Sequence, residues 1–171
     1  MLHEAHTRAQ MLGRHNTTFC QADAEALPFR HNVCDLLTSK LAFHCFPHPQ
    51  VALAEMVRVA TRTARLMLID RVSAEDPEQR TYQNRLEKLR TPSKTYVYSE
   101  SQLVAALADI GLIVEAQARY AEQMAVDEWL RAAGPDEQTA HTILAMLTAD
   151  GDPAGLQVRR QGDQLRQLGH R

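Results

Sequence analysis

An acidic residue and a small residue stand at the centre of the stretch FCQADAEALPF, residues 19–29. The stretch reads as a short strand that ends at Asp23 and runs into a turn of small residues closed by Pro28. A carboxylate only accepts hydrogen bonds, so Asp23 can select an amine of a ligand while Ala24 leaves the neighbouring backbone accessible. The alternative is that Asp23 caps its own turn, as Asp commonly does.

Histidine and cysteine side chains gather over the next twenty residues in a pattern that suggests zinc: His31, Cys34, His44, Cys45 and His48. Cys34 opens a predicted strand, whereas the last three follow its far end, about 30 Å away at ~3.3 Å per residue. Four ligands cannot converge over that distance, so we expect no metal site. His44 can instead orient or deprotonate a ligand group near neutral pH, or, as the alternative, lie buried and satisfy a backbone carbonyl.

Strands and helices alternate through the first half of the chain and must position these residues. A helix is predicted over 2–12, where Gly13 stops it, followed by a strand at TTFC, residues 17–20. A second strand in 32–43 is apolar on both faces from Val33 to Leu37, which indicates a strand covered on both sides. Pro49 opens the next helix, and residues 64–70 form a third strand that ends in Asp70. The apolar stripe of the Pro49 helix is predicted to be Val51, Leu53, Ala54, Met56 and Val57.

The second half is richer in helix signals. A polar helix is predicted from Asp76, with a thin apolar seam that we expect to pack as a cover: Tyr82, Leu86 and Leu89. Ser99 and Gln102 form a capping box for a helix that ends at Gly111. A strand follows at 112–120, then helices at 126–133 and 135–150, and a tail with a hairpin around Gly162 and Asp163 that is polar enough to fray. We therefore expect one domain over 1–150 and a polar tail over 151–171.

The predicted order of strands and helices, with short connections, indicates a parallel sheet with helices on its faces. Ligands bind beyond the carboxyl ends of the strands in such sheets. Asp23, the Ser39–Phe43 segment and Asp70 all lie at those ends, so we expect them to share one rim of the molecule.

Composition limits the classes of function. The chain has 171 residues, 44% of them hydrophobic, and 19 basic against 21 acidic side chains without a basic stripe, which argues against a nucleic-acid partner. It has no apolar run long enough to cross a bilayer and no signal-peptide pattern, so we expect a cytoplasmic protein without membrane contact. Cys20, Cys34 and Cys45 lack CxxC spacing and suit small apolar core residues in a reducing compartment.

Four blocks of the chain are familiar in order and spacing. ADAEALPF, CDLLTSKLAFHCFPHPQVALAEMVRV, RLMLIDRVSAEDPEQ and YSESQLVAALADIGLIVE together resemble the class I S-adenosylmethionine-dependent methyltransferases of the small-molecule type, which include the ubiquinone/menaquinone C-methyltransferases. The resemblance covers residues 1–135. It implies a Rossmann-like α/β fold and methyl transfer from S-adenosylmethionine to a small-molecule acceptor, catalysed mostly by positioning.

The resemblance also implies roles for individual residues. Asp23 would accept a hydrogen bond from the adenine amino group, and the backbone N–H of Ala24 would meet a ring nitrogen of the adenine. Ser39 and Leu41 lie in the segment that passes the methionine end of the cofactor. His44 stands where the family often has a histidine on the acceptor side. Tyr82, Arg85 and Tyr98 match lid and acceptor-pocket positions, where packing and surface exposure are the simpler explanation.

Departures from the family pattern are equally specific. The family begins with a strand, a Gly-rich turn and a second strand ending in an acid, whereas this sequence starts at the helix that follows them, and its seven glycines lie elsewhere. Thr61–Ala64 stand where the family has a Pro-Gly-Gly turn, which indicates either relaxed selection or a different local path. We therefore expect an N-terminally truncated sheet that lacks its first two strands, and weak or absent cofactor binding.

A truncated sheet leaves unpaired backbone on its strands, which is costly. Either the TTFC strand pairs directly with the next strand, or another chain supplies an edge, as in a homodimer formed through the exposed sheet edge, or the fold is loose at this end. We expect the first or the second. Two functional alternatives remain open: a non-catalytic partner of a methyltransferase, or a gene fragment without independent activity.

Overall fold

The computed structural model describes residues 2–120, 124–149, 151–156, 158–161 and 164–167. The first helix, α1 (Leu2–Met11), ends where predicted, and Gly13 follows it with a φ of 64°. Residues 17–20 belong to no strand, so the prediction of a TTFC strand is wrong. Their backbone pairs with no neighbouring strand in the described structure, which also rules out direct pairing of this segment with β1.

Two parallel strands form the sheet on which the candidate site is built. β1 (Cys34–Lys40) pairs with β2 (Ala60–Ile69), and the helix α2 (Pro49–Val59) connects them. Pro49 occupies the first turn of α2, where its missing N–H costs nothing. β2 starts directly after α2, so Thr61–Ala64 form part of a strand and not a turn. The register of the pairing between β1 and β2 shifts between Cys34 and Leu36.

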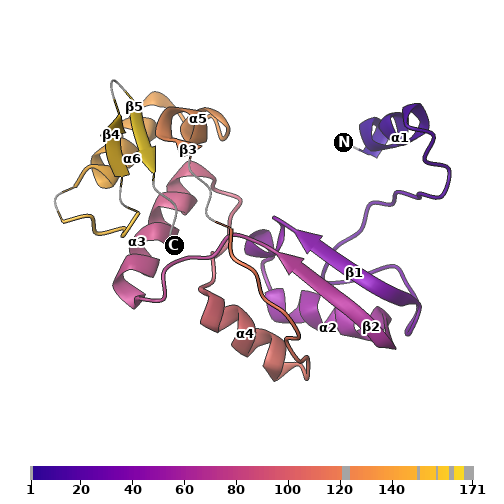
Figure 1. The fold of residues 1–171 in the computed structure, drawn as a ribbon. Helices are drawn as coiled ribbons and strands as arrows, with labels where there is room; N and C mark the ends of the chain where they lie inside the picture. Colours follow the sequence, from indigo (N-terminus) through magenta and orange to yellow (C-terminus); the bar gives the residue numbers. More distant parts are fainter. Residues whose placement is uncertain (1, 121–123, 150, 157, 162–163, 168–171) are drawn as a thin grey trace.

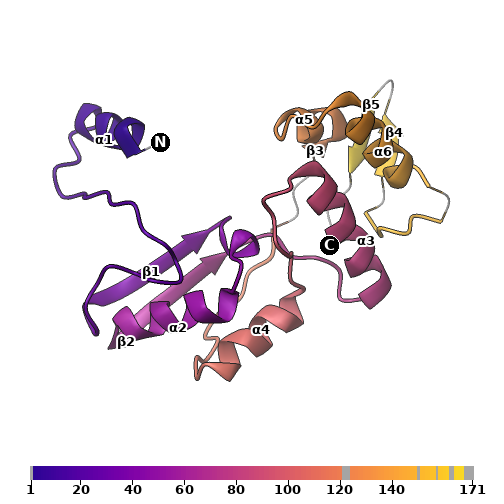
Figure 2. The ribbon, with the colours of Figure 1, turned by 180° about the vertical axis from the view of Figure 1, so that it is seen from behind.

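Helices cover one face of this sheet. α2 and α4 (Glu100–Asp109) lie on the same side in both views, whereas α1 stands apart on the opposite side (Figures 1 and 2). The covered face holds an apolar cluster centred on Phe43, Leu53 and Met56, with Leu37, Leu66, Leu68 and Leu107 packed against it.

The other face of the sheet is open to solvent in the described structure. Leu36, Met67 and Ile69 are 58%, 50% and 44% exposed. The prediction that helices cover both faces is therefore met on one face only, and the expected two-sided burial from Val33 to Leu37 is wrong. The apolar stripe of α2 also differs from the prediction: Leu53 and Met56 are buried, whereas Val51, Ala54 and Val57 are exposed.

Local capping signals place two helices as predicted. α3 (Pro77–Arg90) starts after Asp76, whose carboxylate accepts hydrogen bonds from the backbone N–H groups of Glu78 and Gln79. α4 starts at the complete capping box of Ser99 and Gln102, and Gly111 follows its end with a φ of 79°. The start of each of these two helices is set by side chains within four residues of it, which is why the sequence alone identifies both starts.

The C-terminal part forms a second apolar cluster. It contains α5 (Val126–Arg131), α6 (Glu137–Leu147) and a small antiparallel sheet of β3 (Met124–Ala125), β5 (Gln164–Gln167) and β4 (Val158–Gln161). Pairing of Gln161 with Gln164 confirms the predicted hairpin, whose turn at 162–163 lies outside the described residues. The buried members of the cluster are Leu86, Val126, Trp129, Leu130, Ile143, Leu147 and Ala154.

Two further predictions fail in the second half. Residues 112–120 form no strand, and Ile113 and Tyr120 are 88% and 92% exposed. The seam of α3 does pack, but its Leu86, with Tyr82 and Leu89, joins the C-terminal cluster instead of covering the sheet.

All three cysteines are free thiols, and Cys20 is exposed, so it is not the core residue we expected. Among the described residues, every helix is too short or too polar to cross a membrane.

Candidate functional site

The turn at Asp23 is held by hydrogen bonds between its own residues. The Asp23 Oδ1 atom accepts a hydrogen bond from the backbone N–H of Glu25 at 2.9 Å, and Asp23 and Ala26 form an isolated bridge. The carboxylate therefore caps its own turn, the alternative weighed from the sequence. Asp23 is exposed, and its second oxygen has no hydrogen-bond partner among the residues that the structure describes, so it remains available to a ligand donor.

Two anchors fix this turn beside the end of β1. Glu25 accepts hydrogen bonds from the backbone N–H of His48 at 2.7 Å and contacts His48 Nδ1 at 2.8 Å. Glu55 on α2 accepts a bond from the backbone N–H of Leu27 at 2.8 Å, and Arg58 donates to the Leu27 carbonyl at 2.9 Å. The hydrogen bond from Arg58, opposed in part by burial, lowers the pKa of Glu55 to about 2, so this anchor stays charged in mild acid.

An open depression lies between the turn and the segment after β1. Its volume is about 810 Å³, which is large enough for a nucleoside. The residues that line it are Gln21, Ala22, Asp23, Ala24, Glu25, Phe46 and Pro47. The depression thus offers a free carboxylate oxygen at Asp23, a small side chain at Ala24 and an apolar ring at Phe46.

The end of β1 carries two unusual features at predicted cofactor positions. Ser39 is 6% exposed, and its Oγ atom is buried without a hydrogen-bond partner among the described residues. Leu41 has a φ of 52°, a left-handed conformation that costs a branched residue free energy, and its N–H donates to the Ile69 carbonyl at 2.8 Å. An unpaired buried hydroxyl and a strained residue, two positions apart, are typical of binding sites.

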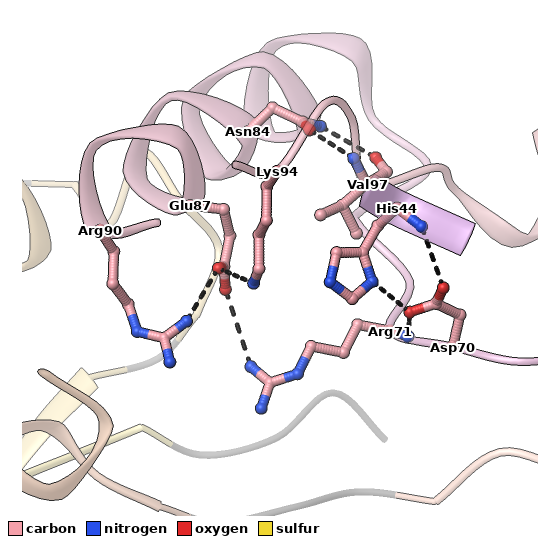
Figure 3. A network of polar contacts seen from close by, with 8 residues as sticks. All are labelled: His44, Asp70, Arg71, Asn84, Glu87, Arg90, Lys94 and Val97. Atoms are coloured by element: carbon pink, nitrogen blue, oxygen red, sulfur yellow. Dashed lines mark hydrogen bonds and ion pairs between the residues drawn. The ribbon is translucent and has the colours of Figure 1, made fainter. Parts of the chain in front are cut away.

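His44 and Asp70 form a buried pair at the carboxyl ends of β1 and β2 (Figure 3). His44 Nδ1 and Asp70 Oδ1 are 2.5 Å apart, and the backbone N–H of His44 donates to Asp70 Oδ2 at 3.1 Å. The side chains of the two residues are 8% and 2% exposed. With Nδ1 engaged by a carboxylate, the ring nitrogen Nε2 is the one left to exchange a proton with a ligand.

Asp70 is held in its charged form by these contacts. Burial alone raises the pKa of this carboxyl, but the His44 side chain and the backbone N–H groups of Arg71 and His44 outweigh it. The pKa of Asp70 therefore lies below its ordinary value. Since His44 directly follows the Ser39–Phe43 segment, this pairing agrees with the prediction that the segment and Asp70 share one rim.

The remaining histidines do not gather around His44. His48 contacts Glu25, whereas His44 contacts Asp70, so the two side chains bind different carboxylates. In the described ranges, no three His, Cys, Asp or Glu side chains are arranged to hold a metal ion.

A charged cluster beside the His44–Asp70 pair was not anticipated. Glu87 on α3 contacts Arg71, Arg90 and Lys94, and Figure 3 shows this network next to the His44 ring. The only sequence signal for it is the spacing of Glu87 and Arg90 on one helix face.

The three predicted lid residues have separate environments. Tyr82 donates from its hydroxyl to the Met146 carbonyl at 3.0 Å, within the C-terminal cluster. Arg85 is exposed, and the ring of Tyr98 packs on Phe43 with centroids 5.7 Å apart. Tyr82 and Tyr98 are therefore packing residues in this structure, and Arg85 is a surface residue.

Comparisons with known proteins agree with this geometry. Residues 1–68 match the methyltransferase domain family Methyltransf_11. An uncharacterized methyltransferase of Bacillus subtilis, YcgJ, is 29% identical over 154 residues, which are 90% of this chain and 61% of that protein. Its crystal structure superposes with a TM-score of 0.91 at 26% identity, covering 99% of this chain and 74% of that one. In sequence and fold, this chain is thus similar to the class I S-adenosylmethionine-dependent methyltransferases.

Two further proteins define the extent of the likeness. A crystal structure of a methyltransferase-like protein from Bacillus halodurans has the same fold, with a TM-score of 0.90 at 19% identity over 97% of this chain and 74% of that one. The ubiquinone/menaquinone biosynthesis C-methyltransferase UbiE of Allorhizobium ampelinum is 41% identical, but over 71 residues only, which are 41% of this chain and 28% of that protein. This chain thus spans about 60% of the length of its Bacillus subtilis relative and less of UbiE.

Proposed function

We propose that this methyltransferase chain contributes the adenine side and the acceptor side of a site for methyl transfer from S-adenosylmethionine to a small molecule. The observation that carries the proposal is the placement of the Asp23–Ala24 turn in a depression that the residues just after His44, Phe46 and Pro47, also line. S-adenosylmethionine supplies a methyl group on a positively charged sulfur, and membership of the family names it as the donor.

Residues of this chain fit two parts of that donor, the adenine and the methionine end. The free Asp23 oxygen and the Ala24 backbone suit the adenine, because they offer an acceptor and a donor side by side. The unpaired Ser39 hydroxyl and the Leu41 backbone stand at the carboxyl end of β1, where a ligand of a parallel sheet binds.

His44 acts on the acceptor side of the proposed site. The Asp70 carboxylate fixes the ring so that Nε2 can take a proton from an acceptor hydroxyl or an acidic carbon. Asp70 also stabilises the imidazolium that forms, because the charge then lies 2.5 Å from a carboxylate oxygen. Asp70 is thus a positioning residue, and His44 is the proposed catalytic residue.

Cofactor binding by the chain as it stands is expected to be weak. The sequence has no Gly-rich turn after a strand, the feature whose backbone approaches the amino acid part of the cofactor in the family. We therefore expect a dissociation constant for S-adenosylhomocysteine of about 0.1 mM or weaker.

Isothermal titration with S-adenosylhomocysteine tests the proposal. Asp23→Ala is expected to weaken binding about tenfold, since it removes a charged hydrogen-bond acceptor. Asp109→Ala, which removes an exposed carboxylate at the end of α4, is the matched control and should bind as the unchanged protein does. Equal affinities for all three proteins would contradict the role of Asp23, and tight binding would contradict the expected weakness.

A further inference from the structure

Two carboxylates line the open depression at the Asp23 turn, and they differ in what they bind. Both oxygens of Glu25 are engaged: Oε1 accepts a bond from the backbone N–H of His48 at 2.7 Å, and Oε2 lies 2.8 Å from His48 Nδ1. Asp23 accepts the Glu25 N–H with Oδ1, and its Oδ2 has no such partner within the described ranges. A ligand in the depression therefore meets a free carboxylate oxygen at Asp23 and not at Glu25.

These bonds form a chain that runs from a helix to the free oxygen. His48 is fixed at the start of α2, because its carbonyl accepts bonds from the N–H groups of Val51 and Ala52 at 2.9 and 3.2 Å. The His48 N–H holds the Glu25 side chain, and the Glu25 N–H in turn holds Asp23 Oδ1 at 2.9 Å. The direction in which Asp23 Oδ2 points is thus set through Glu25.

The two ends of the turn are anchored in different ways. Glu55 and Arg58 on α2 bind the N–H and the carbonyl of Leu27 at 2.8 and 2.9 Å, and the Leu27 side chain packs against the apolar cluster of the sheet. The Asp23 end is exposed, and its anchor is the Glu25 side chain, which is itself 18% exposed. The position of the free oxygen therefore depends on Glu25 more than on core packing.

The direction of a carboxylate oxygen matters because it can only accept hydrogen bonds. Adenine carries an amino group at position 6, which donates. Hypoxanthine carries an oxygen there, and its donor is the neighbouring N1–H group. A small change in where the Asp23 oxygen lies therefore changes which of the two bases it favours.

We propose that Glu25 is a positioning residue that makes the depression select adenine over hypoxanthine, by orienting the free oxygen of Asp23 toward the amino group at position 6. The inference rests on the proposed function, because it explains the selectivity of that same cofactor site. Glu25 itself does not bind the base, since both of its oxygens are engaged by His48.

S-adenosylhomocysteine and its deaminated analogue S-inosylhomocysteine form the probe pair, because they differ only at this edge of the base. Ligand-observed NMR gives both dissociation constants for the full chain. We expect the unchanged protein to prefer the adenine compound about tenfold, and Asp23→Ala to remove the preference.

Three substitutions of Glu25 separate its geometry from its charge. Glu25→Ala should reduce the preference to about twofold or less. Glu25→Asp keeps the charge but withdraws the carboxylate by one methylene group, so it should also leave about threefold or less. Glu25→Gln keeps the length and an oxygen for the His48 N–H, so it should retain about fivefold.

The control variant is Glu137→Ala, which removes an exposed carboxylate on α6 and should leave the preference at about tenfold. Circular dichroism checks that every variant is folded. A carboxylate at the start of α2 also stabilises that helix. If this were the whole role of Glu25, its loss would weaken both compounds by the same factor and leave the preference in place.

Three results would overturn the inference: the full preference in folded Glu25→Ala, the full preference in Glu25→Asp, or its loss in folded Glu25→Gln. If Glu25→Ala does not fold, the other two variants decide in the same way. Asp23→Ala keeps the two proposals apart. An unchanged preference in Asp23→Ala, or no preference or no binding in the unchanged protein, contradicts the proposed function as well, whereas a preference lost in Asp23→Ala and kept in Glu25→Ala contradicts the role of Glu25 alone.

Discussion

The two apolar clusters of the molecule differ in how they are enclosed. The C-terminal cluster is surrounded by α3, α5, α6 and the small antiparallel sheet, and Ile143 at its centre is 0% exposed. The sheet of β1 and β2 is covered on one face, and Ile69 on its other face is 44% exposed. Every residue of the candidate site comes from the second region or its border. Core packing is therefore closest where no chemistry is proposed, and Ser39, with its unpaired hydroxyl, and the strained Leu41 both lie at the end of β1 in the less enclosed region.

Matched substitutions of the two isoleucines test this contrast most strongly. Ile143→Ala should lower the free energy of unfolding by about 3 kcal/mol, since it leaves a cavity in a closed core. Ile69→Ala should lower it by about 0.5 kcal/mol or less, because the side chain is already near water. Urea denaturation followed by circular dichroism measures both.

The Ile69 result also bears on the predicted homodimer. A cost for Ile69→Ala that approaches the cost for Ile143→Ala, and that grows with protein concentration, would mean that a second chain covers the open face or edge. A small cost that does not depend on concentration would count against the dimer. Until then the homodimer stays a prediction.

In the open region, Asp70 links the segment after β2 to the segment after β1 through its bonds to His44. Asp70→Asn should lower stability at neutral pH by about 2 kcal/mol, because it weakens charge-assisted hydrogen bonds to a buried histidine. The folded protein lowers the pKa of Asp70, so its contribution is present above the unfolded value of about 3.9 and is lost as pH falls through the folded pKa.

The pH dependence separates this effect from simple loss of packing. The unchanged protein should lose stability steeply below about pH 4, and Asp70→Asn should lose less over the same interval. Denaturation at a series of pH values gives both curves. Parallel curves for the two proteins would show that Asp70 is not held charged by His44.

Ser99 joins the two regions, because it caps α4 and follows the segment fixed to α3. Ser99→Ala removes the bond to the Gln102 N–H and should lower stability by about 1 kcal/mol. The Ser99 side chain also contacts Ser101, whose hydroxyl binds Glu75 as well, so the cost of Ser101→Ala is an upper limit for the Ser99–Ser101 contact. A folded Ser99→Ala variant as stable as the unchanged protein would contradict the capping explanation.

Sequence reasoning succeeded where the cause of a structure is local. The capping box at Ser99, the cap at Asp76 and the proline of α2 each act within one turn of helix, and all three helices start where predicted. The predicted strands at 17–20 and 112–120 failed, since a strand needs a partner and extended apolar residues alone do not supply one.

The candidate site was predictable in part. Ser39, Leu41, His44 and Asp70 were assigned to strand ends, and the structure joins His44 to Asp70. Asp23 was also assigned to a strand end, but no strand precedes it. The Glu87 cluster was not predictable, because Arg71, Glu87 and Lys94 come together through the path of two loops and a helix. The capping role of Asp23 was weighed as an alternative, and a carboxylate with two oxygens can cap its turn and still bind a ligand.

Titration of the 15N-labelled chain with S-adenosylhomocysteine, followed by two-dimensional NMR, tests the central claim most directly. The account predicts that the largest shifts fall on the backbone N–H groups of Ala24, Ser39 and Leu41, while those around Ile143 stay in place. Shifts centred on the C-terminal cluster, or none anywhere up to saturating ligand, would contradict it.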